Sequence, residues 1–182
     1  MESLNGHPGQ SGARAVTTEV PYDTTATVYQ RNGVTITSFP VIHIINGAVG
    51  YRLDYNGRSV VFSGDTRPCH PLVDACDGAD LLVHETFPSA PVFAQKAGVP
   101  LGFAEQVVNG AHTSPTMAGK VFARAGARMS VMWHLAVDHQ VVGPAYADMR
   151  TQYEGPVSIA QDLTTFDISA DAIITRQSTI DP

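Results

Sequence analysis

The chain has 182 residues, enough for one domain with a hydrophobic core. Its 17 acidic and 11 basic residues give a formal net charge of −6, which disfavours the basic surfaces that bind nucleic acid, and two cysteines are too few for a disulfide framework. No apolar run is long enough to cross a membrane, and the N-terminus lacks the layout of a secretory signal. We therefore expect a cytoplasmic protein without a nucleic-acid or membrane partner.

The first part of the chain predicts a loose start followed by two β-hairpins. Residues 1–22 are rich in Gly, Ser, Thr and Pro without periodicity, and we interpret them as a lead-in to a single domain over residues 23–182. The Asn-Gly pairs at 32–33 and 56–57 each lie between strand-like runs, and such pairs favour tight hairpin turns. These runs therefore predict neighbouring antiparallel strands.

Helix-like and strand-like segments alternate in the rest of the chain. Pro115 follows Ser114 where one helix begins, Gly126 lies near its end, and Pro100 and Gly102 break an earlier helical stretch. This alternation predicts an α/β (α+β) fold with a mixed sheet and flanking helices. The expected helices cover about residues 70–78, 88–110, 114–126 and 144–153, and the expected strands cover about residues 79–85, 127–134 and 156–176.

Polar side chains that can bind metals or move protons follow several of the apolar runs. The run VVFSGD ends in Asp65, and a carboxylate at the end of a buried strand lies where α/β proteins build their sites. Three more strand-like runs end at His43, His84 and His134, and His112 precedes a predicted helix. One carboxylate with several histidines indicates a metal or acid–base site.

Two further features each leave an alternative open. Glu85 directly follows His84, so on a continuing strand the two side chains point to opposite faces and only one can face a site. Lys120, Arg124 and Arg128 are spaced four apart and therefore line one side of a helix. We interpret this basic row as a solvated helix face, with phosphate binding as the alternative.

The ordered motifs VIH…GYR, VVFSGDT, DLLVHETF, AHTSP and MWH resemble those of a known superfamily. Between about residues 34 and 135 they are similar to the C-terminal half of metallo-β-lactamase-fold hydrolases, in particular the branch of ribonuclease Z, arylsulfatase and phosphodiesterases. The resemblance implies an αββα sandwich with a two-metal centre, commonly zinc, between its sheets. This chain would form a partial sandwich.

Position by position, the resemblance implies roles for the polar residues at the strand ends. Asp65 matches the aspartate that bridges both metals. Glu85 and His112 match the pair that assists phosphodiester cleavage in the ribonuclease Z branch, where the histidine protonates the leaving group or stabilises charge. The candidate sets are the metal ligands His43, Asp65 and His134 and the catalytic residues His112, Glu85 and His84.

One element of the superfamily pattern is absent from the chain. The signature His-x-His-x-Asp-His supplies most ligands to both metals, and no His-x-His occurs in this sequence. We therefore expect a truncated, C-terminal portion that binds zinc weakly and has little activity alone. Apolar strand faces around Val60 and Leu81 would then meet water, so a second copy of the chain or a complementing N-terminal half is the expected protein partner.

The predicted function follows from the resemblance and its departures. It is a metal-dependent hydrolase acting on an ester-type bond of a small molecule, such as a phosphodiester, a sulfate ester or a lactone. The motifs HETF and HTSP differ from the HEAT and HST of the ribonuclease Z branch, which leaves the substrate class open. The alternative is a catalytically inactive metallo-hydrolase-like module that binds a ligand or partner.

Overall fold

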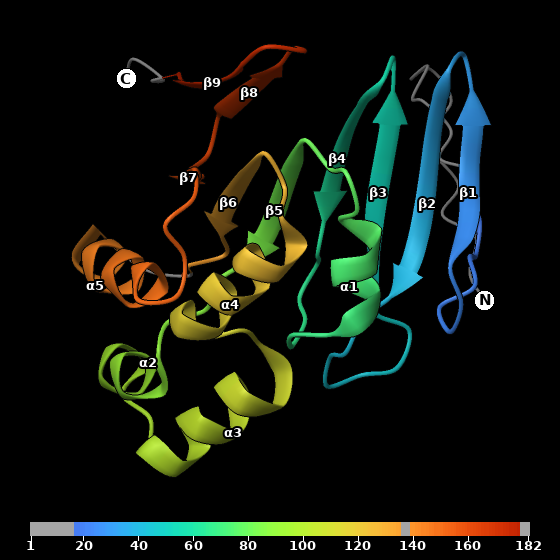
Figure 1. Cartoon of the computed structure of the whole chain (residues 1–182). Helices are drawn as coiled ribbons and strands as arrows, with labels where there is room; N and C mark the ends of the chain where they lie inside the picture. The colour runs from blue at the N-terminus through green and yellow to red at the C-terminus, as the bar shows by residue number, and fades with distance from the viewer. Residues whose placement is uncertain (1–16, 136–138, 179–182) are drawn as a thin grey trace, which may run out of the picture.

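The computed structural model describes residues 17–135 and 139–178, and these residues form one large sheet, a separate hairpin and five helices (Figure 1). The strands of the sheet are β1 (Ala26–Arg31), β2 (Val34–Pro40), β3 (Val49–Tyr55), β4 (Arg58–Phe62), β5 (Leu81–Glu85), β6 (Met129–Trp133) and β7 (Val157–Ile159). The hairpin is β8 (Thr164–Ile168) with β9 (Ile173–Gln177), and the helices are α1 (His70–Ala75), α2 (Ala90–Ala97), α3 (Leu101–Ala111), α4 (Pro115–Ala125) and α5 (His139–Arg150).

The seven-stranded sheet changes from antiparallel to parallel at β4. The spatial order is the chain order, with antiparallel pairs from β1 to β4 and parallel pairs from β4 to β7. The antiparallel part is joined by the two Asn-Gly turns, at which Asn32, Gly33, Asn56 and Gly57 all have positive φ, as tight hairpin turns require. The predicted hairpins are therefore confirmed.

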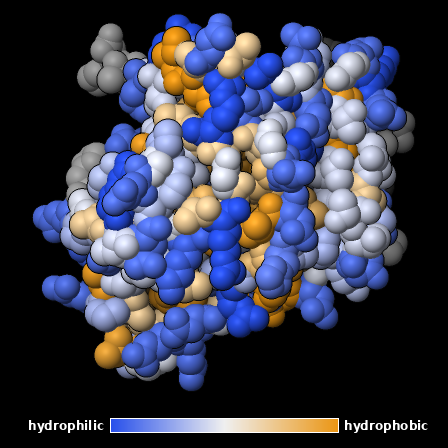
Figure 2. All heavy atoms as spheres, in the orientation of Figure 1, coloured by the Kyte–Doolittle hydropathy of each residue, from blue (hydrophilic) through white to orange (hydrophobic). Residues whose placement is uncertain are grey.

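Helices cover one face of this sheet because each parallel connection needs a crossover. In Figure 1, α1 and α4 lie in front of the strands that they connect. The side chains that meet there are buried and form the core, with Val61, Leu82 and Met132 from the strands against Leu72 and Phe122 from the helices. The expected mixed sheet with flanking helices is confirmed. The visible face of this helix layer is mainly hydrophilic, with apolar patches between the polar side chains (Figure 2).

The opposite sheet face carries exposed aromatic side chains. Tyr51 and Phe62 are cross-strand partners on β3 and β4 and are 38% and 45% exposed, and Trp133 on β6 is 38% exposed. Val60 is half-buried, but Leu81 is only 2% exposed, so our expectation for Leu81 was wrong. Leu81 lies at the start of the central strand β5, paired with Val60 of β4 on one side and with Met129 of β6 on the other.

Some predicted boundaries were also wrong. The helical stretch 88–110 is broken between Gly98, which ends α2 with φ of 66°, and Pro100, the N-cap of α3, so the break at Pro100 is confirmed, whereas Gly102 lies inside α3. Helix α5 begins at His139 and contains Pro144, which the sequence placed at its start. Of the predicted lead-in, residues 1–16 lie outside the described part, and residues 17–22 have no regular secondary structure. No helix within the described ranges has the length and hydrophobicity to cross a membrane.

Asp80 ties the beginning of β5 to its neighbours. Its buried carboxylate accepts hydrogen bonds from the Ser59 amide at 2.8 Å and from Arg128 at 2.6 Å, with Arg58 at 3.4 Å. Burial alone would raise the pKa of Asp80, but the bonds from Arg128 and Ser59 and the charge of Arg58 lower it. Arg128 also donates to the Ser169 carbonyl, which links this end of the sheet to the loop after β8.

Candidate active site

The site lies at the carboxyl ends of the parallel strands. Asp65 follows β4 after a turn at Gly64, which has φ of 60°, Glu85 is the last residue of β5, and His134 comes directly after β6. Because β4, β5 and β6 run in parallel and in register, their last residues reach the same edge of the sheet. The strand-end pattern of the sequence therefore places Asp65, Glu85 and His134 side by side.

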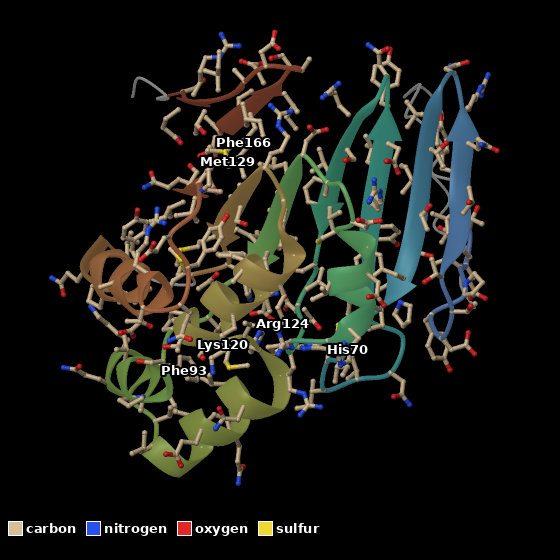
Figure 3. The ribbon with its side chains drawn as sticks, in the orientation of Figure 1. His70, Phe93, Lys120, Arg124, Met129 and Phe166 are labelled. Atoms are coloured by element: carbon tan, nitrogen blue, oxygen red, sulfur yellow. The ribbon has the colours of Figure 1, made fainter. Side chains whose placement is uncertain are left out.

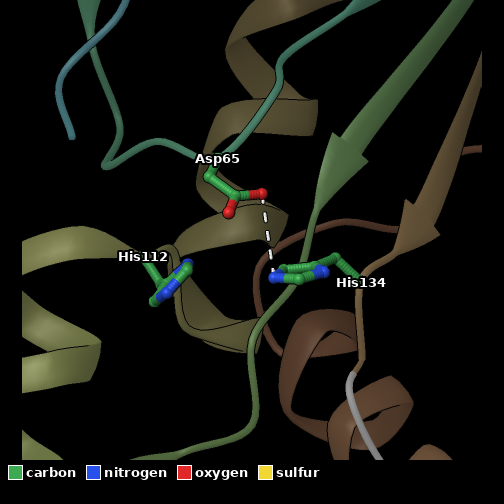
Figure 4. Close-up of side chains that lie close together, drawn as sticks. All are labelled: Asp65, His112 and His134. Atoms are coloured by element: carbon green, nitrogen blue, oxygen red, sulfur yellow. Dashed lines mark ion pairs between the residues drawn. The ribbon is translucent and has the colours of Figure 1, made fainter. Parts of the chain in front are cut away.

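Asp65 and His134 form a compact group with His112, which precedes α4 (Figure 4). Ligand atoms of Asp65, His112 and His134 all lie within 4.8 Å of one another, and each residue is half-buried. The Nε2 atom of His134 is 3.7 Å from Oδ1 of Asp65. His134 has φ of 59°, a left-handed conformation that costs free energy for a residue with a side chain, so the surrounding structure must hold it there.

His112 is oriented by Glu85 and Phe87. Its Nδ1 lies 3.1 and 3.2 Å from the two carboxylate oxygens of Glu85, whose side chain is fully buried. The amide of Thr66 donates to the same carboxylate at 2.5 Å. The Phe87 ring stacks on the imidazole with a centroid distance of 4.2 Å and an angle of 10°. Hydrogen bonding and stacking together fix the plane of His112.

The surroundings of His112 favour its protonated form. Burial lowers the pKa of His112, but the hydrogen bond and charge of Glu85, together with the charge of Asp65, outweigh it and raise the pKa above the usual value. An imidazolium cannot bind a metal ion, but it can donate a proton. The geometry therefore suits His112 to acid catalysis beside the Asp65–His134 pair.

His43 lies next to this group from a different direction. The residue before it, Ile42, pairs with Arg67, which brings the end of β2 to the loop that carries Asp65. Nδ1 of His43 donates to the Ala111 carbonyl at 2.9 Å, and its ring meets the His112 ring edge-on at 5.4 Å. The bond at Nδ1 leaves Nε2 available, the arrangement that is common for metal-binding histidines. His43 is nevertheless not part of the group within 4.8 Å.

The structure does not bring His84 to the site. Side chains alternate along β5, so Glu85 faces His112 while His84 points into the core, where it meets the Phe122 ring edge-on at 6.0 Å. His84 is fully buried, and burial lowers its pKa to about 4. The alternation that left the two residues as alternatives is thus resolved in favour of Glu85.

Two threonines and Phe87 support the site and were not singled out in the sequence. Thr113 Oγ1 donates to the Thr66 carbonyl at 2.6 Å, and the Thr66 amide in turn holds Glu85. The only sequence signal for Thr113 is its position directly after His112. Ser114 does occupy the cap position of α4, but its side chain makes no cap hydrogen bond.

The donor set fits a zinc ion in its chemistry. His134 and Asp65 offer an imidazole and a carboxylate, which are ligand types that zinc accepts, and catalytic zinc sites commonly use three protein ligands. His43 is the candidate for the third ligand, because its ring lies beside that of His112 and its Nδ1, not its Nε2, bonds to the Ala111 carbonyl. The residues present can therefore hold a metal ion.

Comparisons with known proteins identify the family of this chain. Residues 3–135 match the model of the beta-lactamase superfamily domain. The chain belongs to the metallo-β-lactamase superfamily. Its fold resembles that of the metallo-β-lactamase fold protein YhfI from Bacillus subtilis, with a TM-score of 0.57 and 22% identity over 78% of this chain and 52% of that chain.

The similar curated proteins are ribonuclease Z enzymes, of which this chain spans only part. It is 37% identical over 113 residues to ribonuclease Z of Myxococcus xanthus, covering 62% of this chain and 33% of that protein. It is 32% identical over 156 residues to ribonuclease Z of Mycobacterium avium, covering 84% of this chain and 54% of that protein. This member of the superfamily thus resembles a portion of each of these relatives.

Proposed function

We propose that this chain carries part of the active site of a metal-dependent hydrolase that cleaves a phosphodiester bond. The observation that supports it most is the group Asp65, His112 and His134 at the strand ends, with Glu85 holding His112. The relatives named ribonuclease Z favour a phosphodiester over a sulfate ester or a lactone. The net charge of −6 favours a small diester over nucleic acid as the substrate of this chain.

In this proposal Asp65, His134 and His43 hold the metal, and zinc is the ion that their donor types favour. A bound metal lowers the pKa of water and stabilises negative charge on a phosphoryl oxygen. The chain's own residues hold these three ligand side chains in place. The bond from Nδ1 of His43 to the Ala111 carbonyl orients this imidazole and leaves Nε2 for the metal.

His112 acts as the general acid in this proposal. Its Nδ1 is engaged by Glu85, so Nε2 carries the proton that passes to the oxygen of the leaving group as the ester bond breaks. Glu85 stabilises the imidazolium, and Phe87 keeps the ring in one plane. His84 packs against Phe122 and takes no part in the reaction.

We further propose that the open sheet face binds a protein partner, either a second copy or a complementing N-terminal half. Tyr51, Phe62 and Trp133 expose aromatic surface there, and exposed apolar patches are typical of interaction sites. No His-x-His occurs in the sequence, so the ligands named above are fewer than a two-metal centre needs. The chain alone should therefore bind zinc weakly and turn over slowly.

A hydrolysis assay on the zinc-loaded chain tests this function. The substrates are bis(p-nitrophenyl) phosphate, whose leaving group needs little protonation, and a dialkyl phosphate diester, whose leaving group needs a proton. We expect slow turnover that Asp65→Asn abolishes. His112→Ala should slow cleavage of the dialkyl diester by about 100-fold and affect the nitrophenyl ester much less.

The control is Glu105→Gln on the exposed side of α3, which should leave both rates unchanged. Turnover that persists unchanged in Asp65→Asn contradicts the proposed site. No turnover of either diester above background, together with retained zinc binding, supports the inactive binding module instead.

A further inference from the structure

A groove on the helix layer has a composition that the proposed hydrolase does not explain. It lies between α1 and α4, has a volume of about 550 Å³, and shares no residue with the Asp65–His112–His134 group. We refer to it as the α1–α4 groove. It is lined by Pro68, Cys69, His70, Val73, Met117, Lys120, Val121 and Arg124.

The groove is basic in an acidic protein. Lys120 and Arg124, one turn apart on α4, line this groove together with His70 at the start of α1, and all three are labelled in Figure 3. No Asp or Glu is among the lining residues, although the chain carries a net charge of −6. Three groups that carry or can accept positive charge thus share one hollow without a carboxylate.

The two full charges in the groove have no protein partner. Neither Lys120 nor Arg124 forms a hydrogen bond or an ion pair with any residue in 17–135 or 139–178. Arg128, the next residue of the same row, is instead neutralised by Asp80 at 2.6 Å. The C-terminal end of α4 attracts Arg124 through the helix dipole, but Lys120 and His70 lie outside that last turn and need another explanation.

The remaining walls of the groove are apolar. Val73 of α1 lines the groove together with Met117 and Val121 of α4, which lie four residues apart and therefore on one side of that helix. Sites for small molecules commonly combine such walls with a few polar groups and have volumes of about 300–1,000 Å³. The groove therefore suits a ligand with an anionic end and an apolar body.

We propose that the α1–α4 groove binds a small phosphate monoester whose organic part is apolar or aromatic. A phosphate monoester carries a charge of about −1.5 to −2 at neutral pH, which matches Lys120 and Arg124 better than a single carboxylate does. The organic part lies against Val73, Met117 and Val121. The site is independent of the metal and extends what the protein does beyond hydrolysis.

Isothermal titration of the metal-free Asp65→Asn chain in EDTA tests this site apart from the proposed active site. The probes are AMP, adenosine, which lacks the phosphate, and inorganic phosphate, which lacks the organic part. We expect AMP to bind and to weaken with rising salt, because screening reduces the attraction between exposed charges. Adenosine and inorganic phosphate should each bind at least about tenfold more weakly.

The double variant Lys120→Gln/Arg124→Gln should weaken AMP binding by at least about tenfold, because both charge-assisted contacts are lost. Both side chains are exposed, so thermal unfolding of the variant should match that of the parent chain. The matched control is Arg31→Gln on the edge strand β1, which is exposed and lies outside the groove. It should leave AMP affinity unchanged.

Three results would overturn the proposal. The first is no binding of AMP at millimolar concentration, and the second is AMP affinity that the double variant retains. The third is tighter binding of a short RNA oligonucleotide through Lys120 and Arg124, which would make the groove a nucleic-acid contact. Because every arm omits metal and carries Asp65→Asn, failure here leaves the proposed hydrolysis untouched, and failure of hydrolysis leaves this site untouched.

Discussion

At the residue scale, Glu85 decides how His112 behaves. The buried carboxylate is anchored by the Thr66 amide and bonds to the imidazole through both oxygens. Burial alone would make His112 a weaker base than free histidine, and the hydrogen bond and charge of Glu85 reverse this. A raised pKa stabilises the fold below the unfolded value of about 6.5, and that contribution is lost as the pH rises through the folded pKa.

Titration of the metal-free chain by NMR of the imidazole resonances tests this coupling. We expect the pKa of His112 to lie above about 6.5, and Glu85→Gln to bring it to or below that value because burial then dominates. Gln keeps the shape of the side chain and can still accept the Thr66 amide hydrogen bond. Glu105→Gln serves as the control, and a His112 titration that is unmoved by Glu85→Gln would refute the coupling.

The sequence predicted part of this site because strand ends are local features. Asp65 and His134 each follow an apolar run, and parallel strands bring such ends together. The sequence could not decide between His84 and Glu85. Alternation along a strand places the two side chains on opposite faces, but it does not say which face the helices cover. The sequence also could not predict the stacking of Phe87 on His112, because the fold brings together two residues that are 25 positions apart.

At the scale of elements, Gly119 sets the distance between α4 and α5. A β-carbon at this position would collide with the carbonyl oxygen of Met149 in α5, and backbone atoms cannot turn aside as a flexible side chain does. The two helices therefore pack closely only because position 119 has no side chain. The sequence contained this glycine inside a predicted helix but gave no sign of the partner that it meets.

We expect Gly119→Ala to destabilise the fold by about 2 kcal/mol, because α5 must move away from α4. Gly110→Ala in α3 is a matched control, since a β-carbon there meets nothing within 4 Å. Removing that glycine should leave stability unchanged or raise it by about 0.5–1 kcal/mol. Urea unfolding followed by circular dichroism measures both, and equal effects of the two substitutions would contradict the close packing.

Prediction worked best for elements with local signals. The Asn-Gly turns fixed both hairpins, and Gly126 ended α4 with φ of 62° as expected. Prediction worked less well where tertiary contacts determine the bounds of an element. Helix α5, for example, starts at His139 and continues through Pro144. Arg128 shows the same limit, because its spacing placed it in the basic row while the fold pairs it with Asp80.

At the scale of the whole molecule, the sheet has one face packed against helices and another with exposed aromatic side chains. Phe62 and Trp133 are 45% and 38% exposed, which is high for large apolar residues on a sheet. A second copy of the chain or a complementing half would remove this surface from water. The sequence predicted such a face around Val60 and Leu81, although Leu81 is buried.

Size-exclusion chromatography over a range of concentrations tests this surface. We expect the chain to elute earlier as its concentration rises, and Phe62→Ser/Trp133→Ser to elute later than the parent chain under the same conditions. Leu101→Ser is the control, because Leu101 is 48% exposed but lies on α3, away from the sheet face. A compact monomer at every concentration would contradict self-association through this face.

The central claim is that Asp65 and His134 hold a metal ion while His112 serves as the acid beside it. Zinc titration of four chains, the parent, Asp65→Asn, His134→Ala and His112→Ala, tests it most directly. The account predicts weak binding by the parent chain, loss of binding in the Asp65 and His134 variants, and retention in His112→Ala. Loss of zinc in His112→Ala as complete as in His134→Ala, or binding unaffected by Asp65→Asn, would contradict it.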